Sequence, residues 1–179
     1  MKLNIDKKEF DLLIEHDQIK KRIRLIGTQI NVAYEKQVPI FIGVLNGSFM
    51  FMADLMKEID IAAEICFIKL ASYEGKTQKD DVQEIIGLCV DIKDREVIIV
   101  EDIVDTGNTL SYLLERIKEK YPASISICTL LLKPKKLQQQ FDNIAYVGFE
   151  IPDEFVVGYG MDFNGLGRNL KDIYKEHVE

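Results

Sequence analysis

The sequence predicts an α/β fold in which a mainly parallel, twisted sheet is flanked by helices. Short apolar segments rich in β-branched residues alternate with segments whose apolar residues recur at helical spacing. Strands joined through intervening helices form right-handed crossovers and therefore parallel sheets. The 179 residues are 47% hydrophobic and 30% charged, which suits one compact core. Because no repeat or shift in composition divides the chain, we expect a single domain over residues 1–179.

The expected elements begin with a helix over residues 19–34. Ile19, Ile23, Ile26 and Ile30 share one apolar stripe there. A buried strand over 39–45 follows, and Ser48 is placed to cap the next helix. The remaining expectations, in chain order, are a helix over 49–56, a strand over 61–70, a polar loop or flexible hairpin over 72–84, strands over 85–90 and 96–100, a helix over 109–120, and strands over 124–132 and 145–149.

Composition narrows the class of protein. The net charge of −7 argues against a nucleic-acid binder, which needs a basic face. No apolar run approaches a membrane span, and the polar, charged N-terminus does not resemble a signal peptide. Cys66, Cys89 and Cys128 are far apart, odd in number and without zinc-ligand spacing, so we expect free thiols in a reducing compartment. We therefore expect a cytoplasmic protein with neither membrane nor nucleic-acid partners.

The most informative segment runs from Val100 to Leu110, where a buried strand leads directly into two acids. Glu101 and Asp102 stand where hard cations or ribose hydroxyls can be met. The turn over 105–109 offers backbone N–H groups and threonine hydroxyls at a helix N-terminus, which suits a phosphate, and Gly107 allows a close backbone approach. Helix capping explains any one of these residues equally well, but it does not need so many polar groups in one turn.

The string from Glu101 to Thr109 resembles the phosphoribosyl-pyrophosphate-binding signature of type I phosphoribosyltransferases. Further segments resemble the hypoxanthine-guanine branch of that family: Val44–Ser48, Ser72–Tyr73, Lys133–Pro134, Phe155–Asp162 and Arg168. They occur in the family's order over roughly residues 38–170. The resemblance implies a type I phosphoribosyltransferase fold, with a small hood at about 145–179 and a flexible lid loop at about 72–84.

The same resemblance implies an activity. It is a Mg²⁺-dependent transfer of the 5-phosphoribosyl group from phosphoribosyl pyrophosphate to N9 of a 6-oxopurine. The acceptor would be hypoxanthine and also guanine, and the products IMP or GMP and pyrophosphate, in purine salvage. The family commonly forms homodimers or homotetramers, and its other partners are these small molecules. Neither the residues nor the resemblance separates hypoxanthine, guanine and xanthine.

Roles for the residues of the signature follow from the resemblance. Glu101 and Asp102 would lie beside the ribose hydroxyls and their magnesium ion. Asp105 would be catalytic, handling the proton at N7 of the purine. The residues that would cradle the 5′-phosphate are Asp105, Thr106, Gly107, Asn108 and Thr109.

Roles for the base site and the pyrophosphate site also come from the resemblance alone. Lys133 would donate to O6 of the base, although the basic run around it favours a solvated lysine when read without the family. Phe155 would stack on the purine and the Val156 backbone would bind its edge, where plain core residues are the simpler interpretation. Asp162 would serve a second magnesium ion, and Arg168 would contact pyrophosphate; without the family they are a turn residue and a surface residue.

Two loops complete the resemblance. Asn46 and Gly47 match the pyrophosphate-binding loop, in which a non-proline cis peptide is typical. Many members carry lysine where Asn46 stands, so one positive charge is missing here. Ser72 and Tyr73 match a lid that closes over the reacting centre and excludes water.

Three alternatives stay open at this level. The first is an adenine or pyrimidine transferase within the same family. The second is a regulatory protein that keeps the fold but senses nucleotides or binds RNA. The third is a receiver-like signalling domain, although Asn46 holds the position where such a domain would need its phosphoacceptor aspartate. We expect His16 and His177 to be solvated surface residues.

Overall fold

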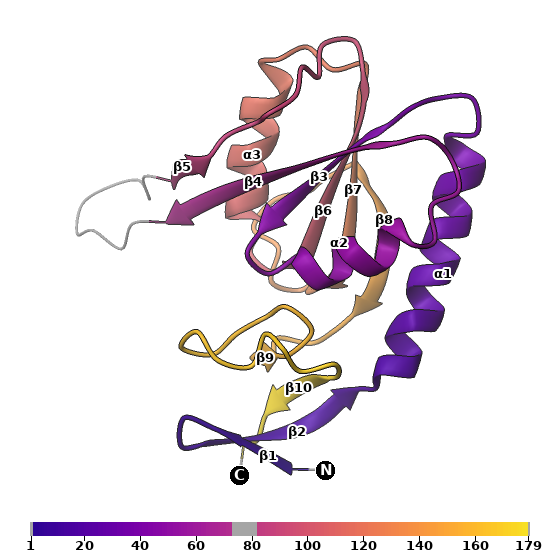
Figure 1. Cartoon of the computed structure of the whole chain (residues 1–179). Helices are drawn as coiled ribbons and strands as arrows, with labels where there is room; N and C mark the ends of the chain where they lie inside the picture. The colour runs from indigo at the N-terminus through magenta and orange to yellow at the C-terminus, as the bar shows by residue number, and fades with distance from the viewer. Residues whose placement is uncertain (1, 73–81, 179) are drawn as a thin grey trace.

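The computed structural model describes residues 2–72 and 82–178 (Figure 1). Their larger sheet has six strands in the order β5-β4-β3-β6-β7-β8. These strands are β3 (Ile40–Leu45), β4 (Glu64–Ser72), β5 (Val82–Ile86), β6 (Glu96–Val104), β7 (Ser124–Leu132) and β8 (Ile144–Glu150). Neighbouring strands are parallel except at the edge, where β5 pairs antiparallel with β4. The predicted α/β class with a mainly parallel sheet is confirmed.

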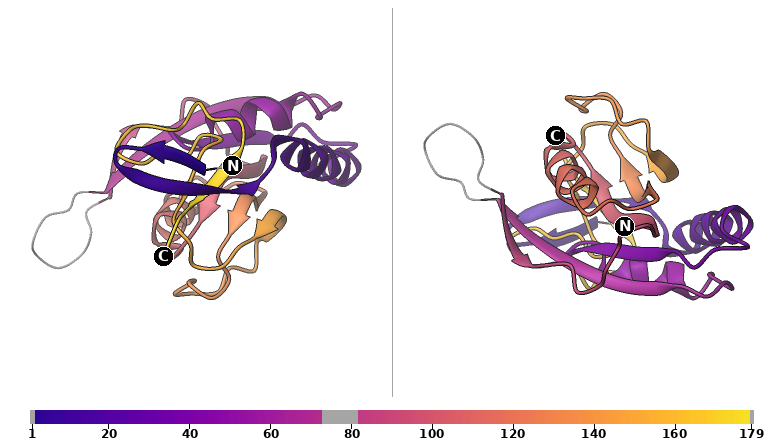
Figure 2. Two further views of the ribbon diagram at one scale, coloured as in Figure 1. Left: turned by 90° about the horizontal axis from the view of Figure 1, so that it is seen from below. Right: turned by 90° about the horizontal axis from the view of Figure 1, so that it is seen from above.

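Helices cover both faces of this sheet (Figure 2). They are α1 (His16–Ala33), α2 (Phe49–Met56) and α3 (Asn108–Lys118). Successive residues of the central strand β6 point to opposite faces: Ile98 and Val100 pack with α1 and α2, while Val97 and Ile99 pack with α3. Burial on both faces explains why β6 has a continuous apolar sequence rather than an alternating one.

A second, antiparallel sheet lies beyond the carboxyl ends of the parallel strands (Figure 1). Its order is β1-β2-β10-β9, from β1 (Lys2–Ile5), β2 (Lys8–Ile14), β9 (Val156–Val157) and β10 (Ile173–Glu176). The two ends of the chain therefore build this region together. The sequence placed the hood at about 145–179, whereas β8 belongs to the larger sheet and the N-terminal hairpin pairs with β10. That pairing was missed because the two partners lie at opposite ends of the chain.

Several element boundaries differ from expectation because pairing extends or shifts strands. Strand β6 continues to Val104, since β7 pairs with it as far as Val104↔Leu132. Strand β5 occupies Val82–Ile86 rather than 85–90, so part of the expected polar loop is strand. Ser48 holds the N-cap position of α2, but its hydroxyl is buried and makes no capping hydrogen bond. Ser72 ends β4, and Tyr73 lies outside the described residues.

In the two described stretches, none of the helices combines the length and the apolar character needed to cross a membrane.

The packing of α3 against the sheet can be tested by substitution. Replacing the fully buried Ile117 by alanine should lower the free energy of unfolding by about 2–5 kcal/mol, because a cavity is left under the helix. Leu25 on α1 is 58% exposed, and its alanine variant should change stability by less than about 0.5 kcal/mol. Urea unfolding followed by circular dichroism measures both variants, and equal losses would contradict this placement of α3.

Candidate active site

The predicted site residues gather at the carboxyl edge of the larger sheet, where ligands bind in open α/β folds. Five segments meet there: the turn after β3, the end of β6 with the turn into α3, the start of the loop after β7, the segment between β8 and β9, and the chain between β9 and β10. In Figure 1 the last of these segments lies beyond the ends of β3 and β8. Sequence positions far apart are thus brought into one region.

Two glycines allow three of these segments to lie in direct contact. A Cβ atom on Gly47 would overlap the carboxylate of Asp102, and one on Gly160 would overlap the carbonyl oxygen of Gly47. The backbone of the turn after β3 therefore lies directly between the acid on β6 and the chain between β9 and β10. The peptide bond from Leu45 to Asn46 is cis, as the resemblance predicts.

Glu101 and Asp102 lie within β6 rather than after it. Glu101 is only 6% exposed, and burial raises the pKa of its carboxyl well above the usual range, with a further contribution from the charge of Asp102. Burial also raises the pKa of Asp102, although the positive charge of Arg168 works in the opposite direction. Over residues 2–72 and 82–178, neither carboxylate takes part in an ion pair. Carboxylate oxygens are the ligands that a hard divalent cation prefers, so these two acids could contribute to holding one. Among the described residues, no group of three or more metal-ligating side chains is gathered in one place.

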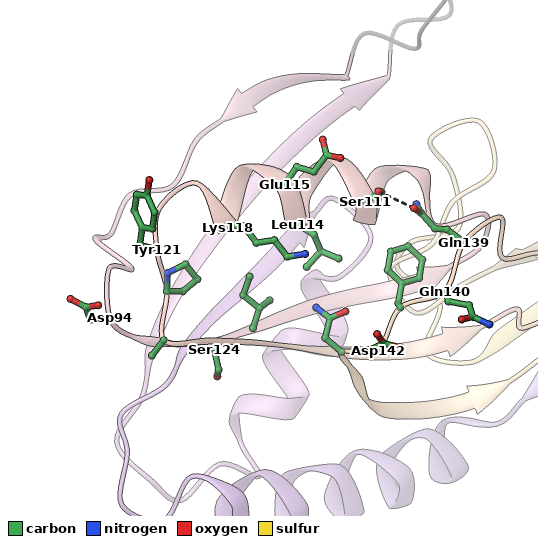
Figure 3. A pocket seen from close by; sticks show the side chains of 15 residues that line it. Asp94, Ser111, Leu114, Glu115, Lys118, Tyr121, Ser124, Gln139, Gln140 and Asp142 are labelled. Carbon is green, nitrogen blue, oxygen red and sulfur yellow. Dashed lines mark hydrogen bonds between the residues drawn. The ribbon is translucent and has the colours of Figure 1, made fainter.

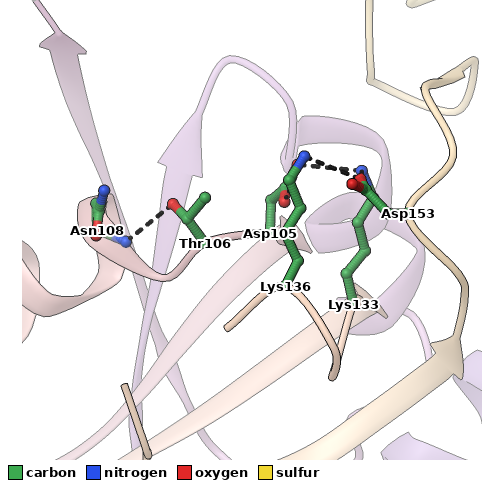
Figure 4. Close-up of polar contacts among 6 residues, drawn as sticks. All are labelled: Asp105, Thr106, Asn108, Lys133, Lys136 and Asp153. Atoms are coloured by element: carbon green, nitrogen blue, oxygen red, sulfur yellow. Dashed lines mark hydrogen bonds and ion pairs between the residues drawn. The ribbon is translucent and has the colours of Figure 1, made fainter. Parts of the chain in front are cut away.

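Lys133 and Asp105 form a charged cluster with two residues that the sequence did not suggest, Lys136 and Asp153 (Figure 4). The Lys133 ammonium lies 3.0 Å from Asp105 Oδ2 and 3.4 Å from Asp153 Oδ1. Lys136 bridges the same two acids, at 3.1 Å from Asp105 Oδ1 and 2.9 Å from Asp153 Oδ1. Lys133 is only 5% exposed, so its interpretation as a solvated lysine is wrong.

The turn from Asp105 into α3 has the shape expected for anion binding. Gly107 precedes the helix with φ at +87°, and a Cβ atom there would overlap the Phe141 ring. No side chain caps the helix at this position, whereas the Asn108 amide donates to Thr106 Oγ1 at 3.4 Å. A hollow of about 90 Å³ is lined by Glu101 and residues 103–110, Thr109 among them. Backbone amides at the start of a helix and a small hollow beside them suit a phosphate group.

Arg168 and Asp162 pair with each other at 2.5 Å. Arg168 also donates to the Gly160 carbonyl at 2.7 Å, and Asp162 accepts from the Gly165 amide at 2.8 Å. Since Gly160 touches Gly47, this ion pair lies close to the turn after β3 and to Asp102. Arg168 is thus a partly exposed residue whose side chain is held by an ion pair and a backbone hydrogen bond.

Phe155 is 44% exposed, although it is a large aromatic residue. Its ring centroid lies 6.5 Å from that of Phe10 and 5.7 Å from that of Phe163, so neighbours hold one side of the ring. Val156 is buried in β9, where it pairs with Lys175 of β10. An aromatic side chain held in place but partly open to solvent can stack on a planar ligand.

Tyr159 is a further residue that sequence reasoning missed. It is completely buried, has φ at +49°, and its hydroxyl donates to Asp54 Oδ2 at 2.6 Å. The bond fastens the chain between β9 and β10 to helix α2. Tyr159 stands between Gly158 and Gly160 within the segment Phe155–Asp162 that carries the resemblance, but no role was assigned to it there.

The histidines differ from expectation. His177 Nδ1 lies 2.6 Å from Asp11 Oδ2, across the pairing of β2 with β10. His16 is half-buried, with its ring centroid 6.2 Å from that of Tyr159. Both interact with neighbouring side chains rather than with solvent alone.

A larger hollow, of about 780 Å³, lies away from these residues. It is bounded by α3, the start of β7 and the loop over 139–143 (Figure 3). None of the predicted site residues lines it, so its size does not make it the candidate active site.

Comparison with known proteins defines the class. The family model described as "Phosphoribosyl transferase domain" matches residues 11–164, and the chain belongs to this family. A hypoxanthine phosphoribosyltransferase of Haemophilus influenzae is 45% identical over 97% of this chain and 98% of its own length. A hypoxanthine-guanine phosphoribosyltransferase of Bacillus subtilis is 41% identical over 97% and 94%.

Solved structures agree with the sequence comparison. A crystal structure of a hypoxanthine phosphoribosyltransferase from Staphylococcus aureus superposes with a TM-score of 0.88 at 38% identity, covering 93% of this chain and 91% of that one. The type I phosphoribosyltransferase fold predicted from the resemblance is thereby confirmed.

The buried acid pair gives a prediction about stability. A carboxyl whose pKa is raised in the folded state destabilises that state progressively as pH rises from the usual glutamate range to the raised pKa, and fully above it. Glu101→Gln removes this titration. Without added metal, the variant should be more stable than the original protein by at least about 1 kcal/mol at pH 8, and the difference should shrink as pH falls towards 4.

Thermal unfolding across this pH range measures the effect. Glu35→Gln, at an exposed position on the segment after α1, is the matched control and should show no such pH dependence. Equal stability of Glu101→Gln and the original protein at pH 8 would mean that the buried carboxylate is not destabilising.

Proposed function

We propose that this protein transfers the 5-phosphoribosyl group from phosphoribosyl pyrophosphate to N9 of a 6-oxopurine, giving a purine nucleoside 5′-monophosphate and pyrophosphate. One observation carries the proposal: the acid pair, the phosphate turn, Lys133 and Arg168 converge on one edge of the sheet in a chain of the phosphoribosyl transferase family. The names of relatives that match nearly its whole length support hypoxanthine, and in one case guanine, as the acceptor.

The phosphoribosyl donor would lie across the end of β6. The turn formed by Asp105, Thr106, Gly107, Asn108 and Thr109 would hold its 5′-phosphate through backbone amides and hydroxyls. Glu101 and Asp102 would hold the ribose hydroxyls together with Mg²⁺. Bound there, Mg²⁺ would supply positive charge that offsets the negative charge on the departing pyrophosphate.

The pyrophosphate would lie against the turn after β3. Asn46 and Gly47 would offer backbone amides, and Arg168 would contribute the charge that Asn46 lacks. The Asp162 carboxylate has acceptor sites beyond those used by Arg168 and Gly165, so it could also serve a second Mg²⁺. Together these groups would stabilise the negative charge that develops as the bond to C1 breaks.

The purine would lie between Phe155 and the ribose, with the Val156 backbone at its edge. O6 and N7 lie on the same side of a 6-oxopurine. Lys133 and Asp105 are 3.0 Å apart, so one base can meet both, with Lys133 donating to O6 and Asp105 handling the N7 proton. Because an ammonium group only donates, Lys133 favours a 6-oxo group over a 6-amino group.

The setting of the reaction follows the family resemblance. We infer a cytoplasmic enzyme of purine salvage that works as a homodimer or homotetramer and has small molecules as its substrates. The lid role of Ser72 and Tyr73 stays a prediction, since Tyr73 lies outside the described residues. Size-exclusion chromatography with light scattering determines the oligomeric state.

A spectrophotometric assay tests the proposed reaction. Phosphoribosyl pyrophosphate and Mg²⁺ are offered with hypoxanthine, guanine, xanthine, adenine or uracil in parallel. We expect turnover of hypoxanthine, no turnover of adenine, and loss of activity when a chelator removes Mg²⁺. Turnover of adenine or uracil alone would overturn the role of Lys133, and turnover of no base would favour a regulatory protein that binds nucleotides.

The role of Asp105 has its own test. Asp105→Asn keeps the size of the side chain but removes its ability to accept a proton, so kcat should fall by roughly 10²–10⁴-fold. Binding of the nucleoside monophosphate, measured by calorimetry, should change far less. Asp142→Asn, which alters a carboxyl outside the site, is the control and should retain full activity. Equal losses of turnover and binding in Asp105→Asn would count against a proton-transfer role.

A further inference from the structure

Two cysteine thiols lie almost in bonding contact, away from the proposed catalytic groups. The sulfur atoms of Cys66 and Cys89 are 2.8 Å apart, and the Cys89 amide donates to Cys66 Sγ at 3.4 Å. A disulfide would join the same atoms at about 2.05 Å. The sequence predicted separate free thiols, because 22 intervening residues gave no reason to pair them.

The pairing of β4 with β5 explains how the two residues meet. Lys69 of β4 pairs with Ile86, the last residue of β5, in the antiparallel register. Continued three residues past the end of β5, the same register places Cys66 opposite Cys89. The register shifts between Lys69 and Leu70, so the strands beyond this point pair one residue out of step. The two cysteines face each other only in the first register.

We propose that Cys66 and Cys89 form a reversible disulfide by exchange with a low-molecular-weight disulfide. Cys89 is exposed, so its thiolate would attack the small disulfide, form a mixed disulfide and release one thiol. The Cys66 thiolate would then attack the Cys89 sulfur and release the second thiol. In sum, two protein thiols are oxidised to one disulfide while one small disulfide is reduced to two thiols.

The two sulfurs differ in a way that sets this order of events. Cys66 is 1% exposed on β4, and burial, followed by its contact with Cys89, raises the pKa of its thiol. An external disulfide therefore reaches Cys89 first, while the Cys66 sulfur already lies beside the position it must attack. Cys128 on β7 is fully buried, and burial raises the pKa of its thiol too, so it should not take part.

The disulfide would fasten β4 to the chain that follows β5. The disulfide would close the loop of chain between Cys66 and Cys89. This closure restricts the unfolded chain more than the folded one, in which the sulfurs already lie together. The oxidised protein should therefore melt higher than the reduced protein, by roughly 5–10 °C. This inference does not depend on the proposed transferase activity.

Equilibration of the whole protein with reduced and oxidised glutathione tests the proposal. After alkylation of the remaining thiols in denaturant, mass spectrometry should show one alkyl group on the oxidised protein and three on the reduced protein. Digestion should yield one cross-linked peptide pair containing Cys66 and Cys89. Cys128→Ser should give the same cross-link and the same rise in melting temperature, whereas Cys89→Ser should give neither.

Three results would overturn the proposal. One is a stable mixed disulfide of glutathione on Cys89 with no internal cross-link. Another is a disulfide-linked dimer that forms through Cys89 of two molecules. The third is a cross-linked protein whose melting temperature equals that of the reduced protein. Melting of the reduced Cys89→Ser variant at the temperature of the reduced original protein shows that the substitution itself does not disturb folding.

Discussion

The desolvation of two neighbouring carboxylates, Glu101 and Asp102, is the constraint on which the rest of the site depends. Both lie near the carboxyl end of β6, the strand between β3 and β7, and burial there raises the pKa of both carboxyls. Such a pair weakens the fold unless positive charge compensates it. Compensation by a substrate-bound cation would couple the stability of this edge to occupancy of the site, a pattern in which function is favoured over stability.

Beside this acid pair, the turn after β3 lies in direct contact with both Asp102 and the chain between β9 and β10. Gly47 touches the Asp102 carboxylate and Gly160 touches Gly47, so neither position has room for a side chain. The hydrogen bond from Tyr159 to Asp54 then fixes the segment of Gly160 to α2. The position of Arg168 and Asp162 relative to β6 thus depends on a chain of contacts that begins at a helix on one face of the sheet.

The charged cluster around Lys133 shows how the tertiary structure changes the interpretation of a residue. Read alone, Lys133 is one of several basic residues after a strand, and solvation is its simplest state. In the fold it is buried beside Asp105 and Asp153, and Lys136 bridges the same two acids. Nothing in the sequence pointed to Lys136 and Asp153 as members of this cluster. Its four residues come from three separate segments, after β6, β7 and β8.

The sequence alone determined the α/β class, the central strands and the glycine-bearing turn into α3, because these features depend on local periodicity and on residue types in one contiguous segment. The family resemblance added expected roles for Lys133, Phe155, Asp162 and Arg168. Only the tertiary structure decided that β1 and β2 complete the second sheet, that β6 extends past its acids, that Tyr159 fastens the site to α2, and that Cys66 meets Cys89. Each of these depends on contacts between residues distant along the chain. Such contacts produce no local periodic pattern from which they could be predicted.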